Sequence, residues 1–120
     1  MGVRAVRGAV QINSDDRAQM LAGVADLLGA VLARNELTPD DLISVIFTAT
    51  PDLHSEFPAY GVRALGISDV PMLCATELDV ADSLPRVIRM LAHVETSRPR
   101  ADIQHVYLGG ATALRPDLAP

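Results

Sequence analysis

Apolar residues recur along this chain in two rhythms, one typical of strands and one typical of helices. Residues 3–12 are rich in apolar and β-branched side chains, interrupted by Gly8, which predicts a strand that bulges or is closely approached at the glycine. Over residues 20–31 the apolar positions recur three or four residues apart, so we predict a helix at about 15–35. The polar run at 13–16 supplies its N-cap and acids suited to the helix dipole.

Three short elements are predicted in the middle of the chain. Thr-Pro-Asp-Asp at 38–41 predicts one helical turn, because proline is favoured at the first helical position. The continuous apolar and β-branched run LISVIFTA at 42–49 is typical of a strand buried on both faces. A short helix near Ala59–Leu65, a turn at 66–69 and a short strand at Val70–Cys74 follow.

The last part of the chain predicts one more helix and one more strand. Four apolar residues at helical spacing predict a third helix over about 82–95, with Asp79 or Asp82 as its N-cap. These four residues are Leu84, Val87, Ile88 and Leu91. Residues 97–100 end this helix, and the run IQHVYL at 103–108 predicts the last strand.

The predicted order of elements, β-α-β-α-β-α-β, indicates an α/β (α+β) fold built as one domain over residues 1–120. A single mixed β-sheet with helices on one face is the simplest arrangement of these elements. A chain of 120 residues has too few elements to cover the second face of that sheet. We therefore expect self-association, with the sheets of several copies packed against one another in a closed ring.

The amino-acid composition argues against some classes of protein. The net charge of −5 argues against an electrostatic nucleic-acid binder, and all ten basic residues are arginines that would have to gather locally to bind an anion. One cysteine, Cys74, excludes an intramolecular disulfide and favours a reducing compartment. We find no signal peptide and no apolar run of about 20 residues that would span a membrane. A soluble cytoplasmic protein is expected.

Motifs for metal, nucleotide or nucleophilic chemistry are missing from the sequence. It contains neither a P-loop nor a G-x-G-x-x-G fingerprint, and its three histidines lack metal-ligand spacing. Cys74 ends an apolar strand, so an inert buried thiol is favoured over a nucleophile. We therefore expect neither a metal nor a cofactor.

Several polar residues interrupt apolar patterns, and each has a plain structural explanation. Arg4 and Arg7 in the first strand are equally well explained as ligand-binding groups or as solvated edge residues. Glu77 follows a strand, where α/β folds place ligand-binding groups, although a helix cap is the commoner role. Arg89 lies roughly 140° from the apolar stripe of the third predicted helix, which predicts solvent exposure. For Tyr107, in the last strand, a place in the core is the default.

Several segments together resemble the monofunctional chorismate mutases of the small trimeric α/β class. They occur in the family's order and nearly its spacing, and they span almost the whole chain. The segments are V-R-G-A (6–9), A-T-P-D-L-H (49–54), F-P-A (57–59) with Arg63, C-x-x-E-L-D (74–79), I-R-M (88–90), H-V-Y-L (105–108) and A-x-L-R-P-D-L (113–118).

This resemblance implies an isomerase that converts chorismate to prephenate in aromatic amino acid biosynthesis, the shikimate pathway, without metal or cofactor. It also implies a pseudo-barrel homotrimer with sheets inward, helices outside, and active sites in clefts between neighbouring subunits. Arg7, assisted by Tyr107, would bind a substrate carboxylate, Arg89 would bridge a carboxylate and the ether oxygen, and Glu77 would accept from the ring hydroxyl. The remaining implied site residues are an apolar wall of Phe57, Ala59, Leu73 and Cys74, and Arg63, Leu114 and Arg115 at the mouth. Tyr60 stands where the family commonly has lysine.

Two other functions use arginines in a similar way. A non-catalytic trimeric module that binds an acidic metabolite would need the arginines but no group opposite an ether oxygen. A small trimeric hydrolase of the imine-deaminase type also sets arginine against a carboxylate, and would hold an ordered water beside the glutamate. The motifs expected for that hydrolase are missing from this sequence.

Overall fold

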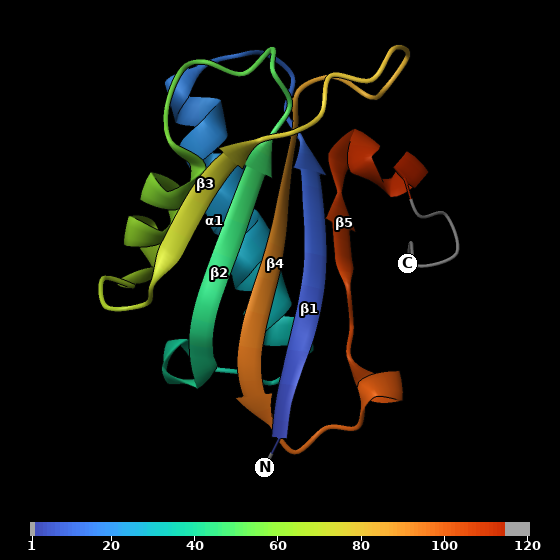
Figure 1. Cartoon of the computed structure of the whole chain (residues 1–120). Helices are drawn as coiled ribbons and strands as arrows, with labels where there is room; N and C mark the ends of the chain where they lie inside the picture. Colours follow the sequence, from blue (N-terminus) through green and yellow to red (C-terminus); the bar gives the residue numbers. More distant parts are fainter. Residues whose placement is uncertain (1, 115–120) are drawn as a thin grey trace.

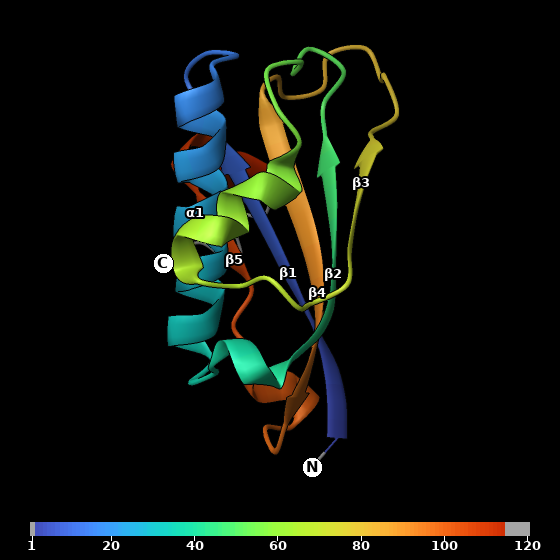
Figure 2. The same ribbon diagram turned by 90° about the vertical axis from the view of Figure 1, so that its left-hand side faces the viewer.

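The structure is a computed structural model that describes residues 2–114. Five strands form one mixed sheet in the order β3-β2-β4-β1-β5 (Figure 1). Their bounds are β1 Gly2–Gln11, β2 Leu42–Ala49, β3 Met72–Thr76, β4 Val87–Thr96 and β5 Val106–Leu108. The helix α1 (Arg17–Arg34) and the 3₁₀ helix η2 (Pro58–Leu65) lie on the same side of the sheet (Figure 2). The prediction of one mixed sheet with helices on one face is therefore confirmed.

Strand β4 lies at the centre of the sheet. It pairs antiparallel with β1 along the whole of both strands, from Gly2 opposite Thr96 to Gln11 opposite Val87. On its other side it pairs antiparallel with β2. The outer strands β5 and β3 then pair in parallel with β1 and β2 respectively.

The core lies between α1 and one face of this sheet. Alternate residues of β4 are buried toward α1 because successive side chains of a strand point to opposite faces. These residues are Ile88, Met90, Ala92 and Val94. At Gly8 of β1, a Cβ would lie 2.9 Å from Leu27 Cδ1 of the helix, while the β1–β4 register runs on without a shift. The glycine thus permits close approach and marks no bulge.

The third predicted helix, 82–95, was wrong, because Val87–Thr96 is strand β4. Apolar residues occupy both faces of β4, and the positions of Val87, Ile88 and Leu91 also fit a helical stripe. The alternation that identifies the strand begins only at Ile88 and is obscured by the apolar residues on the second face. Asp79 and Asp82 lie in the loop before β4 and cap no helix there.

Other predicted elements were close to those observed. The helix predicted at 15–35 is α1, whose N-cap Asp16 accepts the Gln19 amide N–H at 3.0 Å. The strand 42–49 coincides with β2, but Ile46 on its second face is 36% exposed, so it is not buried on both faces within this chain. The turn at 38–41 is the 3₁₀ helix η1 (Pro39–Asp41), and the helix near Ala59–Leu65 is η2.

The last two predicted strands differ in their bounds. The strand predicted at 70–74 begins two residues later, at Met72, and ends at Thr76. The strand predicted at 103–108 is shorter, because the 3₁₀ helix η3 (Arg100–Asp102) and an irregular connection precede β5.

The buried side chain of Asn35 ties the end of α1 to the segment before β5. Its Nδ2 donates to the carbonyl oxygens of Val31, at 2.8 Å, and Gln104, at 2.9 Å. Its Oδ1 accepts the Gln104 amide N–H at 2.7 Å. The side chain is only 1% exposed, so water cannot replace these bonds when they are lost.

We expect Asn35→Ala to lower the free energy of unfolding by about 1–3 kcal/mol, because it leaves buried polar groups unsatisfied. Urea denaturation at one fixed protein concentration measures this loss. Asn13→Ala is the matched control, since Asn13 is exposed, and its effect should stay within about 0.5 kcal/mol. Equal losses in both variants would contradict the role given to Asn35.

Candidate functional site

The face of the sheet away from α1, which we call the open face, carries Arg7, Thr48 and Arg89. A hollow of about 390 Å³ lies on this face over β1, β2, β4 and β5. It is lined by Arg7, Gly8, Ala9, Ile46, Thr48, Arg89, Met90, Leu91 and Tyr107. Arg7, Arg89 and Tyr107 were all predicted as site residues, and the structure brings them together in this open-face hollow.

Arg89 forms an ion pair with Glu77. Its Nε lies 3.1 Å from each carboxylate oxygen of Glu77, which follows β3 and is held by its own amide N–H donating to the Ala49 carbonyl at 2.9 Å. The Arg89 side chain is 40% exposed and that of Glu77 is 15% exposed. Within residues 2–114, no hydrogen bond is made by the two Nη nitrogens of Arg89. The pair therefore fixes the guanidinium while leaving two donors for a ligand.

The predicted exposure of Arg89 rested on the wrong element. On β4 its side chain alternates with the core residues Ile88 and Met90, so it points to the open face and is half-buried. Arg7 also points to this face from the neighbouring strand, with Arg7 opposite Leu91 and Ala9 opposite Arg89 in the β1–β4 register. The two arginines therefore approach the same hollow from adjacent strands.

Thr48 is a residue of the site that the sequence did not reveal. Its Oγ1 donates to Glu77 Oε2 at 2.6 Å, so the carboxylate is held by Thr48 and Arg89 together. A threonine in a strand is ordinarily explained by β-propensity, and nothing in its spacing singles it out. Its place next to the last residue of a strand is no signal of a ligand-binding group.

Tyr107 lies at the base of the open-face hollow and is only 4% exposed. It packs with Ala9, Val87 and Ala111, and Leu114 lies against the same cluster. The default expectation of a core tyrosine therefore agrees with its burial, although its side chain also lines the hollow. Arg115 lies outside the described residues.

The residues of the predicted apolar wall do not line the open-face hollow of their own chain. Phe57 and Cys74 line a second hollow, of about 410 Å³, together with Ala75 and Thr76. Ala59 and Arg63 line a third, of about 250 Å³, and the Arg63 guanidinium stacks 4.3 Å from the centre of the Tyr60 ring. Within one chain, neither hollow includes a residue of the pair Arg89–Glu77.

Three residues of this wall are exposed. Leu73 is 68% exposed, and Cys74 is exposed as well, which corrects the expectation of an inert buried thiol. The reason is that β3 is an edge strand with a neighbour on one side only, and η2 does not extend over Cys74. Phe57 is 62% exposed, so all three apolar groups lack a cover within residues 2–114.

Asp15 holds the segment that leads to Phe57. Its carboxylate accepts the amide N–H groups of His54, at 3.0 Å, and Ser55, at 3.1 Å. The hydrogen bond from His54 is the main cause that lowers the pKa of Asp15 below its usual value. The stability gained is therefore present above the pKa of the unfolded chain and is lost as the pH falls through the lowered pKa.

The described residues offer little for binding a metal. No group of three or more His, Cys, Asp or Glu side chains in residues 2–114 is arranged to hold a metal ion. Along the same stretch, no helix is long and apolar enough to cross a membrane. The open-face hollow is lined by two arginines and a tyrosine, and Glu77 pairs with one of these arginines, an arrangement that suits a small polar anion.

Comparisons with known proteins agree with this geometry. The sequence profile of the family described as chorismate mutase type I matches residues 3–118. The chain is 39% identical to chorismate mutase AroH of Bacillus subtilis (strain 168), covering 99% of this chain and 94% of that protein. It is 44% identical to chorismate mutase AroH of Thermus thermophilus, covering 97% and 96% respectively.

A solved structure gives the same result for the fold. A chorismate mutase from Clostridium thermocellum superimposes with a TM-score of 0.90 at 39% identity, covering 92% of this chain and 98% of that one. The family profile covers residues 3–118, and so includes Arg7, Arg89 and Tyr107. The chain therefore belongs to the type I chorismate mutase family.

Proposed function

We propose that this protein converts chorismate to prephenate, with Arg89 as the group that stabilises the transition state. The observation that carries the proposal is the Arg89 guanidinium, whose Nε lies 3.1 Å from the Glu77 carboxylate and whose side chain lines the same hollow as Arg7. Membership of the chorismate mutase family supports the choice of substrate.

The reaction is a rearrangement within one molecule, in which a C–O bond breaks while a C–C bond forms. It requires no base, nucleophile or electron carrier, so the chain has to supply only geometry and charge. As the C–O bond lengthens, the ether oxygen gains negative charge, and a fixed cation beside it lowers the barrier. Arg89 suits this role because its planar fork stays charged and can bind a carboxylate and the ether oxygen together.

The other groups of the hollow hold the substrate in its reactive shape. Chorismate is a dianion, and Arg7 with Tyr107 would bind one of its carboxylates. Glu77 would accept a hydrogen bond from the ring hydroxyl through the oxygen that Thr48 does not saturate. When the substrate's own side chain is held over its ring, the reactive conformer, which is rare in solution, becomes the bound one. This is a proximity effect.

We further propose that the working form is a homotrimer whose inward-facing sheets form a pseudo-barrel. The open face exposes a band of large apolar residues that a single chain leaves in water. These are Val3, Ile43, Ile46 and Leu73, each at least 36% exposed. In the trimer, Phe57, Ala59, Leu73 and Cys74 of one copy would complete the hollow lined by Arg7 and Arg89 of its neighbour, with Arg63 at the mouth.

The two alternative functions find no support in the comparisons, since the family profile, the two relatives and the solved structure named above are all chorismate mutases. A direct test mixes the purified protein with chorismate and follows the loss of chorismate absorbance and the appearance of prephenate. We expect turnover in the presence of a chelator and without added nucleotide. Binding without turnover would favour the metabolite-binding module and contradict the proposal.

Variants of Arg89 distinguish a catalytic role of this residue from a role in binding alone. Replacing it with citrulline, which is neutral and similar in shape, should lower kcat by on the order of 10²–10³-fold, because the lost charge acts mainly in the transition state. Arg89→Lys keeps the charge but loses the fork, and should regain only part of the rate. Arg34→Met serves as the control, since Arg34 lies exposed on α1. A citrulline variant with weaker binding and unchanged kcat would make Arg89 a carboxylate clamp only.

A further inference from the structure

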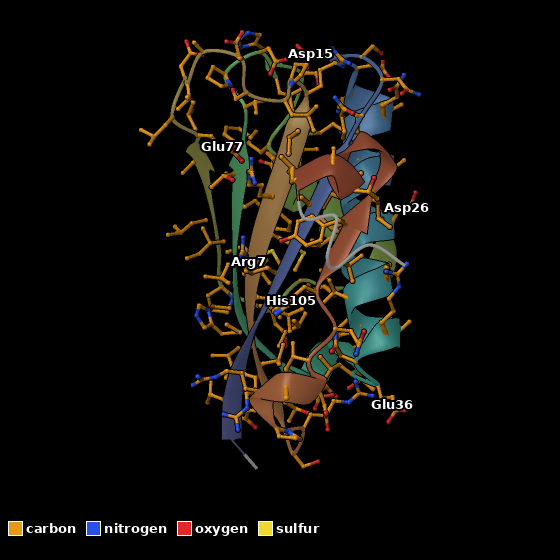
Figure 3. The ribbon with its side chains drawn as sticks, turned by 90° about the vertical axis from the view of Figure 1, so that its right-hand side faces the viewer. Arg7, Asp15, Asp26, Glu36, Glu77 and His105 are labelled. Atoms are coloured by element: carbon orange, nitrogen blue, oxygen red, sulfur yellow. The ribbon has the colours of Figure 1, made fainter. Side chains whose placement is uncertain are left out.

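We propose that His105 is a positioning residue for Arg7, because its imidazole fixes the main chain of β1 where the Arg7 side chain enters the open-face hollow. The proposal rests on the function proposed above, in which Arg7 binds a substrate carboxylate. Figure 3 shows Arg7 and His105 close together on neighbouring parts of the sheet, although 98 positions separate them along the chain.

The contact is a hydrogen bond from main chain to side chain. The amide N–H of Arg7 donates to Nδ1 of His105 at 2.9 Å. Strand β5 begins at the next residue, and its parallel register with β1 starts at Gly8 opposite Val106. The imidazole therefore extends the β1–β5 pairing by one position, accepting the N–H that would otherwise face the unpaired side of β1.

This position matters because the Arg7 side chain has no partner of its own among the described residues. The side chain is exposed on the open face, so only the position of the Arg7 main chain restrains where the guanidinium can lie. On the other side, β4 holds the strand through Leu91, which faces Arg7 in the register. His105 holds it from the β5 side, and Asn35 holds the preceding residue, Gln104, to the end of α1.

The hydrogen bond also requires a particular state of the imidazole. Nδ1 can accept the Arg7 N–H only when it carries no proton, so the ring must be neutral with its proton on Nε2. Arg4 of β1 and Arg100 of η3 line the same small hollow as His105, and Arg7 itself is the bonded neighbour.

The test compares two variants of His105 in two backgrounds, with kcat and KM for chorismate as the readout. His105→Ala should lower kcat/KM roughly tenfold, mainly through KM, because the loss of one hydrogen bond loosens the carboxylate-binding arginine. His105→Asn should regain most of this loss, because the Asn Oδ1 can take the place of Nδ1. In an Arg7→Ala background, His105→Ala should cause no further loss, since its effect acts through Arg7.

The pH dependence of kcat/KM distinguishes a positioning role of His105 from a purely structural one, which would leave it unchanged. Protonation of His105 breaks the bond, so the wild-type kcat/KM should fall on the acid side, and in His105→Asn this fall should move to lower pH. Two results would overturn the proposal: equal losses from His105→Ala with and without Arg7, or a His105→Asn variant as impaired as His105→Ala. Sedimentation should report the same oligomer for every variant.

The failure of this proposal can be told from failure of the proposed function. If the wild-type protein does not turn over chorismate, the function fails, whereas the contact is still tested by nitrogen-15 NMR of the imidazole and by hydrogen exchange at the Arg7 amide. We expect an unprotonated Nδ1 and an Arg7 amide that exchanges faster in His105→Ala than in His105→Asn. A protonated Nδ1 at neutral pH would overturn the positioning role directly.

Discussion

Both the core and the candidate site depend on strand β4, which is paired with a strand on each side. Its side chains contribute to the core on one face and to the open-face hollow on the other. Toward α1 it presents Ile88, Met90, Ala92 and Val94 to the core, and toward the open face it presents Arg89. Because β1 and β2 hold it along its length, the backbone under Arg89 has little freedom to move. A cation that stabilises developing charge has to be held in a fixed position, and a strand paired on both sides holds it there.

The ion pair between Arg89 and Glu77 contributes to orientation more than to stability. Because the Arg89 side chain is 40% exposed, water screens its charge, and the pair is worth only about 0–1 kcal/mol. Its effect is geometric: Nε faces the carboxylate, and the Nη donors are left for the proposed substrate. Thr48 adds a second bond to Glu77, and His105 does the same for the main chain of Arg7. Each proposed contact with the substrate thus has a second residue behind it.

Much of this fold could be predicted from the sequence, for reasons visible in particular segments. The helix α1 has a clean apolar stripe and an acidic N-cap, and β2 is rich in apolar and β-branched residues, so local pattern and final structure agree. In β4 they disagreed, because Val87 and Leu91 are apolar on the face that also carries Arg89. A strand with two apolar faces has no alternation to reveal it.

The site was partly predictable, and mostly through the family resemblance. Arg7 and Glu77 stood out as polar groups at strand positions, but Arg89 was assigned to the wrong kind of element, and Thr48 gave no signal. No pattern in the sequence indicates that Phe57 and Cys74 lie outside the open-face hollow. That separation depends on the assembled fold, because Phe57 precedes η2 and Cys74 lies on the edge strand β3.

If Phe57 of a neighbouring copy completes the hollow lined by Arg89, two inactive variants that each retain one half of the site should restore activity when they assemble together. Arg89→Gln and Phe57→Asp should each be nearly inactive as a trimer, the second because a carboxylate is placed against a dianion. Co-expressed in equal amounts, they should regain up to about a quarter of the wild-type activity, since one interface in four then pairs two intact halves. A mixture no more active than the sum of its separate variants, with trimers formed, would contradict the account.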